Sequence, residues 1–480
     1  MSRVETPRQA FTMQRANLFA KNTARSRAQT HEVIDQQALS DVLDASRRGG
    51  GIYLGQAQSR WLFSGEGRSA MVLGPTRSGK TTSIIIPNLL GHAGPVVSTS
   101  TKSELVSLTA EARSTIGNCM VFDPTGMAEL PPNAARIGWS PLSGCQDWDI
   151  AMANALAMTK AAGQRAMTND HWSERAGALL STLLHAAAIE EVGIRTFVQW
   201  VDRAQAGDAS RILATNTCST PQAEALLDGI LQIHDREQSG IWSTASSVLR
   251  AYRSEQALQS AEGTLFDASA FLEESNSLYL CGSSAQQELL APLFVGLLSS
   301  LRDAAYTASN AQLGFDPVLF ALDEIANIAP FPDLPNLISE GGGQGVLTLA
   351  CLQDLSQARR RWGPEADGFV SLFPVTMLLP GIADRTTLTL VHDLAGEQLE
   401  LHASRTEPSR GFPRRASTTL SGMHRPVQPM NVIAKGLEGH ALMIGPTRDV
   451  MPIELTPSHR SKPWSKLRSL DRSRSDRSRF

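Results

Sequence analysis

Short apolar runs recur along the chain from Gly51 onwards, and residues typical of turns flank each of them. A run of four to eight apolar residues without alternation is typical of a strand buried on both faces of a sheet. Helical periodicity separates most of these runs, so the pattern predicts βαβ units and a mostly parallel central sheet, the α/β class. The predicted strands are Ser69–Leu73, Pro95–Thr99, Cys119–Phe122, Leu278–Cys281, Val318–Leu322, Val346–Leu352, Thr376–Leu379 and Ala441–Ile444.

One long stretch, from about Asp147 to Ala270, carries little strand signal and much helical periodicity. We interpret residues 146–270 as an all-α domain inserted into an α/β domain made of residues 50–145 and 271–455. A polar segment, residues 1–49, precedes that domain and ends at a run of three glycines. Residues 456–480 form a basic tail rich in Ser and Arg, which we predict to be disordered.

Composition and charge narrow the function classes. The 480 residues are 42% hydrophobic and carry a formal net charge of −3, so any nucleic-acid contact has to come from local patches. The five cysteines show no CxxC spacing, which argues against a zinc site or a disulfide framework. We find no secretory signal peptide and no apolar run of the roughly 18–20 residues that a membrane span needs. These features lead us to expect a cytoplasmic chain without a transmembrane segment.

A phosphate-binding motif follows the first predicted strand of this domain. Gly74-Pro-Thr-Arg-Ser-Gly79-Lys80-Thr81 matches GxxxxGK[ST], the Walker A motif, and a helix can begin at Thr82. In such a loop, backbone N–H groups surround the phosphates, Lys80 contacts the β/γ oxygens and the Thr81 hydroxyl binds Mg²⁺. The sequence therefore predicts an ATP or GTP site. Its binding residues are Gly74, Pro75, Thr76, Arg77, Ser78, Gly79, Lys80, Thr81 and Thr82.

Two adjacent carboxylates end a later apolar strand. Asp323 and Glu324 follow Val318–Leu322, as in a Walker B motif, in which the Asp holds the Mg²⁺ shell and the Glu activates the attacking water. Gln353 ends the next strand, where a polar side chain can sense the γ-phosphate. A strand between those of Walker A and Walker B marks RecA-like motors, so we predict a RecA-like P-loop NTPase by fold analogy.

These motifs come in the order found in type IV secretion coupling proteins, the TraG/TraD-like conjugative DNA-transfer ATPases. The chain resembles this family over roughly residues 50–450. The segment LDEIANIAPFPDLP followed by a strand that ends in Gln is fairly specific, whereas many ATPases share the Walker motifs. The resemblance rests on GPTRSGKTT (74–82), VVSTSTKSEL (96–105), VFDPTG (121–126), WSPL (139–142), FALDEIANIAPFPDLPNLISEGGGQG (320–345) and LACLQDLSQ (349–357).

The resemblance implies a homo-hexameric ring that hydrolyses ATP with Mg²⁺ and moves DNA, or protein substrates, into a secretion channel. Lys80 and Thr81 would bind nucleotide and Mg²⁺, and Asp323 and Glu324 would form the Walker B pair with Gln353 as the sensor. The implied partners are DNA, expected to be single-stranded and bound to a relaxase, and type IV secretion components. The implied location is peripheral, at the inner face of the bacterial cell membrane, with the helical insertion recognising cargo.

Three features depart from the family pattern. Family members usually carry N-terminal transmembrane helices, which we do not find here. Many place an arginine eleven residues before the sensor Gln, a position that Gly342 occupies in this sequence. An arginine finger would have to come from elsewhere, for which Arg359–Arg361 and Arg385 are guesses. The second strand, which often ends in an Asp-Pro-Lys-Gly-like turn, here continues as Ser98-Thr-Ser-Thr-Lys102.

Two other functions stay open at the level of sequence. An FtsK/HerA-like translocase acting on duplex DNA would use the same motifs. A nucleotide-gated cargo receptor that barely hydrolyses ATP would explain the missing anchor and Gly342. Intact Lys80, Asp323, Glu324 and Gln353 argue against the receptor, because a receptor has no need of a hydrolytic water.

Overall fold

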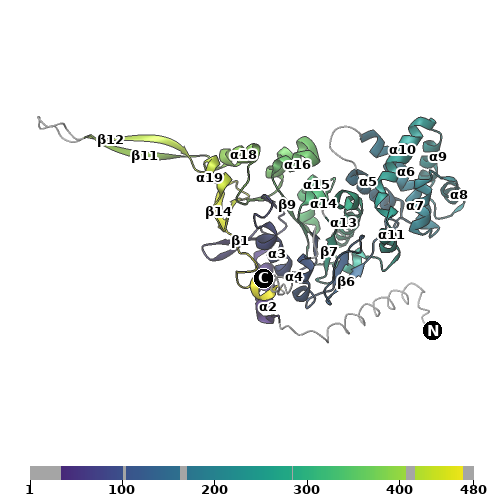
Figure 1. Cartoon of the computed structure of the whole chain (residues 1–480), viewed down its shortest axis with the longest axis horizontal. Coiled ribbons are helices and arrows are strands. Elements are labelled where there is room, and N and C mark those ends of the chain that lie inside the picture. Colours follow the sequence, from purple (N-terminus) through teal and green to yellow (C-terminus); the bar gives the residue numbers. More distant parts are fainter. Residues whose placement is uncertain (1–33, 101–103, 163–169, 284, 407–416, 469–480) are drawn as a thin grey trace, which may run out of the picture.

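The computed structural model describes residues 34–100, 104–162, 170–283, 285–406 and 417–468, and Figure 1 shows the rest as a grey trace. A twelve-stranded sheet forms its centre, in the order β2-β1-β14-β13-β10-β3-β9-β8-β4-β7-β5-β6. A separate hairpin, β11–β12, projects from the body (Figure 1). The strands are β1 (Tyr53–Ala57), β2 (Arg60–Phe63), β3 (Ala70–Leu73), β4 (Val96–Ser100), β5 (Cys119–Phe122), β6 (Ala134–Ile137), β7 (Ser277–Cys281), β8 (Val318–Leu322), β9 (Val346–Leu352), β10 (Val375–Leu378), β11 (Glu397–Thr406), β12 (Ser417–Pro426), β13 (His440–Ile444) and β14 (Val450–Glu454).

The eight strands from β10 to β6 are parallel to one another, and we call them the parallel half. Their sequences are mostly continuous apolar runs because helices cover both faces of the sheet. All eight predicted strands are present, with ends that differ by at most one residue. Strand β9 lies between β3 and β8, so the RecA-like α/β prediction is confirmed.

The other edge of the sheet is antiparallel, and β13, β14, β1 and β2 form what we call the wing. The sequence predicted only β13 of these four. Strands β2 and β14 are partly exposed and lack a continuous apolar run, which is why the pattern did not reveal them. β6, at the opposite edge of the sheet, was missed for the same reason.

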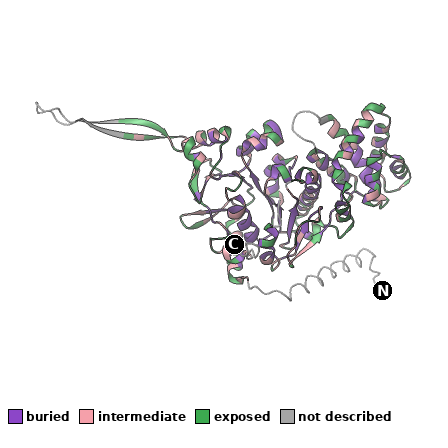
Figure 2. Ribbon diagram, in the orientation of Figure 1, coloured by how far each residue is buried: buried purple, intermediate pink, exposed green. Residues whose placement is uncertain are grey.

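Helices cover both faces of the sheet, and Figure 2 shows the buried strands between helices whose outer sides are exposed. One face packs against α13 and its neighbours, the other against α2, α3, α4 and α20. The helices around the sheet are α2 (Gln36–Gly49), α3 (Ile86–Gly91), α4 (Glu104–Arg113), α13 (Gln287–Asn310), α14 (Ile325–Ile328), α15 (Leu334–Glu340), α16 (Leu355–Trp362), α17 (Phe369–Leu372), α18 (Arg385–Ala395), α19 (Met430–Lys435) and α20 (Trp464–Leu467).

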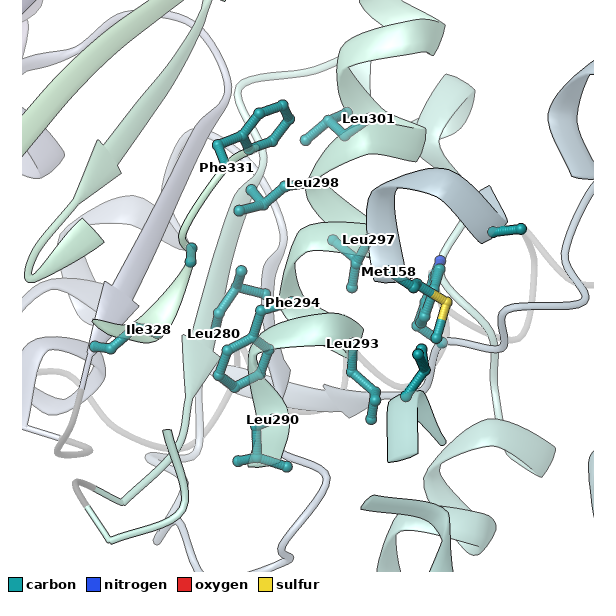
Figure 3. Packing of buried hydrophobic residues seen from close by; sticks show 14 of the residues in the cluster. Met158, Leu280, Leu290, Leu293, Phe294, Leu297, Leu298, Leu301, Ile328 and Phe331 are labelled. Atoms are coloured by element: carbon teal, nitrogen blue, oxygen red, sulfur yellow. The ribbon is translucent and has the colours of Figure 1, made fainter. Parts of the chain in front are cut away.

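Within the described residues, eight α-helices and one short 3-10 helix, Arg250–Arg253, lie between β6 and β7, on one side of the sheet in Figure 1. Helix α13 joins them to the sheet, because its buried side chains contact strand residues on one side and α5 on the other (Figure 3). These helices are α5 (Trp148–Ala162), α6 (Asp170–Ile189), α7 (Ile194–Asp202), α8 (Gly207–Thr215), α9 (Pro221–Leu231), α10 (Asp235–Val248), α11 (Glu255–Glu262) and α12 (Ala268–Leu272).

In the part of the chain that the structure describes, α13 alone has the length and apolar composition needed to cross a membrane. Leu293, Phe294, Leu297 and Leu298 of this helix are fully buried in the protein. Most of its apolar surface therefore serves as a core contact, which makes α13 weak evidence for a membrane span.

Both ends of the described chain pack on the wing. Leu39 and Val42 of α2 belong to the same buried cluster as Trp464 of α20, which is 1% exposed. Predicted disorder of the tail is therefore wrong for residues 456–468, because aromatic burial holds them against the sheet. Residues 1–33 and 469–480 lie outside the described residues.

Candidate nucleotide site

The Walker A loop, Gly74–Thr81, follows β3 at the carboxyl edge of the parallel half. Two glycines make its shape possible: a Cβ on Gly74 would lie 2.6 Å from Ser78 Oγ, and Gly79 has a φ of +97°. Lys80 is buried, and its Nζ donates to the carbonyl oxygens of Gly74, at 2.5 Å, and Pro75, at 3.0 Å. The loop therefore curls around the Lys80 ammonium group.

The helix after the loop begins with a π-helical turn, Thr81–Ile85, in which the Ile86 N–H donates to the Thr81 carbonyl five residues earlier. The π spacing does not continue past this bond, because Pro87 has no N–H to donate to the Thr82 carbonyl five residues earlier. The Thr82 carbonyl instead accepts a hydrogen bond of 2.8 Å from the N–H of Ser458, far along the chain. Single π turns of this kind are frequent at functional sites.

The Walker B residues lie directly opposite. Asp323 follows β8, and its Oδ2 accepts a hydrogen bond of 2.8 Å from Thr81 Oγ1. Thr99 of β4 donates to the Asp323 carbonyl oxygen, also at 2.8 Å, and so fixes the end of the strand. Burial raises the pKa of Asp323, while the Thr81 hydrogen bond and the charge of Lys80 oppose this shift.

Glu324 adopts a left-handed backbone conformation, with φ 50° and ψ 45°. Its carbonyl accepts from the N–H groups of Asn327 and Ile328, which begins α14 directly at the site. A residue with a Cβ in this region costs on the order of 1–3 kcal/mol, and such strain concentrates at functional sites. No pattern in the sequence indicates this conformation, because Glu has no special preference for it.

Gln353 follows β9, between the strands that carry the Walker A and Walker B residues. Its N–H donates to Gln357 Oε1 at 2.8 Å, and the Gln357 N–H in turn donates to Asp354 Oδ1. The start of α16 thus anchors the backbone of Gln353 at the edge of the sheet. The sequence missed this anchoring residue, although an Asp followed three residues later by Gln is a helix-start signal.

Comparisons with known proteins agree with this arrangement. A family model described as Type IV secretory system Conjugative DNA transfer matches residues 18–421. The chain belongs to this family. Protein VirD4 of Rhizobium radiobacter is 24% identical over 371 residues, covering 70% of this chain and 49% of that protein. Conjugal transfer protein TraG of Escherichia coli is 24% identical over 343 residues, covering 65% of this chain and 53% of TraG.

The chain thus spans about half the length of these two curated relatives. The solved unbound form of the bacterial conjugative coupling protein TrwBdeltaN70 superposes with a TM-score of 0.61 at 16% identity, covering 87% of this chain and 91% of that one. A TrwB structure in complex with ADP and Mg²⁺ has a TM-score of 0.57 at 18% identity, covering 82% and 85%. Similarity at this level of identity establishes the fold.

The arginine that many family members place before the sensor Gln has no room in this chain. A Cβ on Gly342 would lie 1.8 Å from the carbonyl oxygen of Gly67. Arg359 is paired with Asp367, and Arg361 donates to the Ala161 carbonyl of α5 at 2.8 Å. Arg385 remains exposed at the start of α18.

Two residues near the candidate motifs have structural roles: Asp123 of the segment VFDPTG, and Trp362, which directly follows Arg359–Arg361. Asp123 caps its own turn, accepting from Thr125 and from the Ala128 N–H, and it pairs with Arg136 at 3.0 Å. Trp362 is buried and donates to the Phe331 carbonyl, so it offers no open ring face. Lys102 lies outside the described residues.

Proposed function

We propose that the chain is the motor of a type IV coupling protein, hydrolysing ATP to move DNA or protein substrates into a secretion channel. The contact between Thr81 and Asp323 carries this proposal. It joins the two halves of a P-loop ATPase site across 242 positions of sequence, at a donor–acceptor distance of 2.8 Å. The family supports the transport role, and because the chain spans half of its curated relatives, the activity of the whole protein belongs to the proposal.

The residues at the site fit a nucleoside triphosphate with Mg²⁺. Ser78 Oγ is buried without a hydrogen-bond partner inside the loop, and glycines keep the backbone open to a phosphate. Mg²⁺ prefers one or two protein oxygens and completes its shell with water and phosphate oxygens. Thr81 and Asp323 would supply those oxygens, and the described residues hold no cluster of three or more His, Cys, Asp or Glu that would compete.

Hydrolysis would rest on three side chains of this chain. Bound Mg²⁺ would neutralise phosphate charge, and Lys80 would add a cation at the β/γ oxygens. Glu324 would orient and deprotonate the attacking water, with its strained backbone fixing the direction of the carboxylate. Gln353 would sense the γ-phosphate from the strand tip between the two motifs. The nucleotide is ATP in this proposal, bound by residues 74–82.

We further propose that the chain acts as a homo-hexamer at the cytoplasmic face of the cell membrane. Its partners would be secretion components and a relaxase with single-stranded DNA. An arginine from a neighbouring subunit would complete the site, and exposed Arg385 is the first candidate. Arg360 is also exposed and is a second candidate. Arg359 and Arg361 are weaker candidates, because both already have partners within the chain.

The test measures ATP hydrolysis by the purified chain alone, with single-stranded DNA and with duplex DNA, while mass is followed by light scattering. Lys80→Ala and Glu324→Gln should each lower turnover at least 100-fold. Lys435→Ala, which removes an exposed lysine of α19, is the matched control and should keep full activity.

Each result has a definite meaning. Stimulation by single-stranded DNA would support the coupling protein. Stimulation by duplex DNA alone would favour an FtsK/HerA-like translocase. A folded, assembled chain that binds ATP without turnover would be a nucleotide-gated receptor, and the motor proposal would be wrong.

A further inference from the structure

We propose that the C-terminal segment 456–468 is a positioning element of the nucleotide site, acting through the N–H of Ser458. This N–H donates to the Thr82 carbonyl at 2.8 Å, one residue after the predicted Mg²⁺ ligand Thr81. Ser458 is fully buried although it lies more than 370 positions from the loop that it contacts. The inference rests on the proposed ATP site, and its test separates the failure of either idea.

The helix itself creates the need for this contact. A carbonyl in a helix pairs with the N–H four residues later, or five later in a π turn. For Thr82 these are Ile86, whose N–H already goes to Thr81, and Pro87, which has none. The Thr82 carbonyl therefore has no partner within its own helix, and Ser458 supplies the missing donor.

Buried hydrogen bonds hold the segment around Ser458 against β1. The hydroxyl groups of Thr456 and Tyr53 are hydrogen-bonded at 2.8 Å, and both residues are buried. The backbone of Tyr53 forms a reciprocal pair with the Asn88 side chain of α3, with both bonds at 2.8 Å. The C-terminal segment and β1 therefore form hydrogen bonds with the same helical stretch at two places, Thr82 and Asn88.

Aromatic stacking fixes the far end of the segment. The Trp464 ring lies 5.3 Å from that of Trp61, nearly parallel, and 5.1 Å from that of Tyr53. Lys466 forms an ion pair of 2.6 Å with Asp35 at the start of α2. The donor at Ser458 thus belongs to a preorganised body, which α2, β1 and residues 456–468 build together.

The position of Ser458 allows a sharp test. Ser458 is the second residue of a turn closed by the Arg460 N–H and the Pro457 carbonyl, a position at which proline is well tolerated. Ser458→Pro removes the N–H and the hydroxyl, and its ring carbon replaces the amide hydrogen next to the Thr82 carbonyl. Ser458→Ala is the matched control, because the hydroxyl that it removes has no hydrogen-bond partner.

A second substitution restores the missing bond from the other side. Pro87→Ala gives the helix an N–H at position 87, which can satisfy the Thr82 carbonyl without Ser458. We expect Ser458→Pro to weaken binding of a fluorescent ATP analogue with Mg²⁺ about tenfold. Ser458→Ala should bind as the unmodified chain does, and the double variant Ser458→Pro/Pro87→Ala should recover most of the affinity.

Hydrogen exchange of the Ile86 amide provides a readout without nucleotide. It should quicken in Ser458→Pro, stay slow in Ser458→Ala, and slow again in the double variant. Unchanged affinity and unchanged exchange in Ser458→Pro would overturn the inference. If the unmodified chain fails to bind ATP, the proposed function is wrong, while the exchange data still test the contact.

A variant that fails to fold does not end the test. Tyr53→Phe removes only the hydroxyl that meets Thr456, and it should lower ATP affinity two- to threefold with the fold intact. Equal affinity for this variant and the unmodified chain would then count against the positioning role.

Discussion

The parallel half and the wing of the same sheet are stabilised in different ways. In the parallel half, β3, β8 and β9 are buried along their whole length, and their carboxyl ends carry the candidate site. In the wing, β2 and β14 are partly exposed, and a cluster of aromatic rings around Trp464 holds the strands to the body. The candidate site therefore lies where many buried contacts hold each strand, whereas the wing depends on a few aromatic side chains.

The largest effect should come from Arg113, at the amino edge of the parallel half. Its guanidinium is fully buried and donates to the carbonyls of His92, Gly94 and Ser275 and to the Ser277 hydroxyl. Arg113→Leu leaves these acceptors without donors and should lower the free energy of unfolding by about 4 kcal/mol. Denaturant unfolding followed by circular dichroism measures the change.

Arg113→Lys provides the control. A lysine keeps the positive charge but reaches fewer of the carbonyls, so the loss should be smaller than for leucine. A loss below about 1 kcal/mol in Arg113→Leu would show that other contacts hold the amino edge of the sheet when the hydrogen bonds of Arg113 are removed.

The wing should respond to one aromatic residue. Trp464→Ala removes the ring that contacts Trp61 and Tyr53 and should cost about 3 kcal/mol. The loss should be concentrated in the wing, so hydrogen exchange should quicken in β1 and β2 before β3. Trp464→Phe should cost less, because it keeps an aromatic ring in place. Equal quickening in both halves would show that the two do not unfold separately.

The same contrast explains what the sequence could reveal. Continuous apolar runs such as Val318–Leu322 are strands in the structure because both faces are buried. The Walker motifs predict a nucleotide site at the ends of these strands. The wing strands alternate weakly, and their partners are distant along the chain: Tyr53 meets Thr456, and Ser458 meets Thr82. Such contacts depend on tertiary packing, which no local pattern encodes. The left-handed conformation of Glu324 could not be predicted either, because it too depends on tertiary packing.

A smaller effect should appear with pH at the end of α3. Burial, with a smaller contribution from the charge of Arg113, lowers the pKa of His92 to about 4, although the hydrogen bond to the Pro317 carbonyl and the charge of Asp316 oppose the shift. The unfolded chain binds a proton near pH 6.5, so stability falls as the pH drops from about 6.5 toward 4. By pH 5 the loss should be about 2 kcal/mol.

The control for this prediction is His92→Gln, which keeps a side-chain donor for the Pro317 carbonyl but does not titrate. The difference in unfolding free energy between the two proteins should change with pH only below about 6.5. A constant difference from pH 7 to pH 5 would mean that the pKa of His92 is the same in the folded and unfolded chain, so that burial does not lower it.

The smallest change in stability should be a gain, and it should come from Glu324 at the carboxyl edge of the parallel half. Glu324→Gly places glycine at φ 50°, where it meets no steric penalty, and should raise the free energy of unfolding by about 1 kcal/mol. ATP hydrolysis should fall at least 100-fold, because the carboxylate is lost. Glu324→Gln separates the two effects: it should lose the same activity without gaining stability. If Glu324→Gly proves no more stable than Glu324→Gln, the left-handed backbone at this position is not strained. The direction of the Glu324 side chain would then cost the fold no stability.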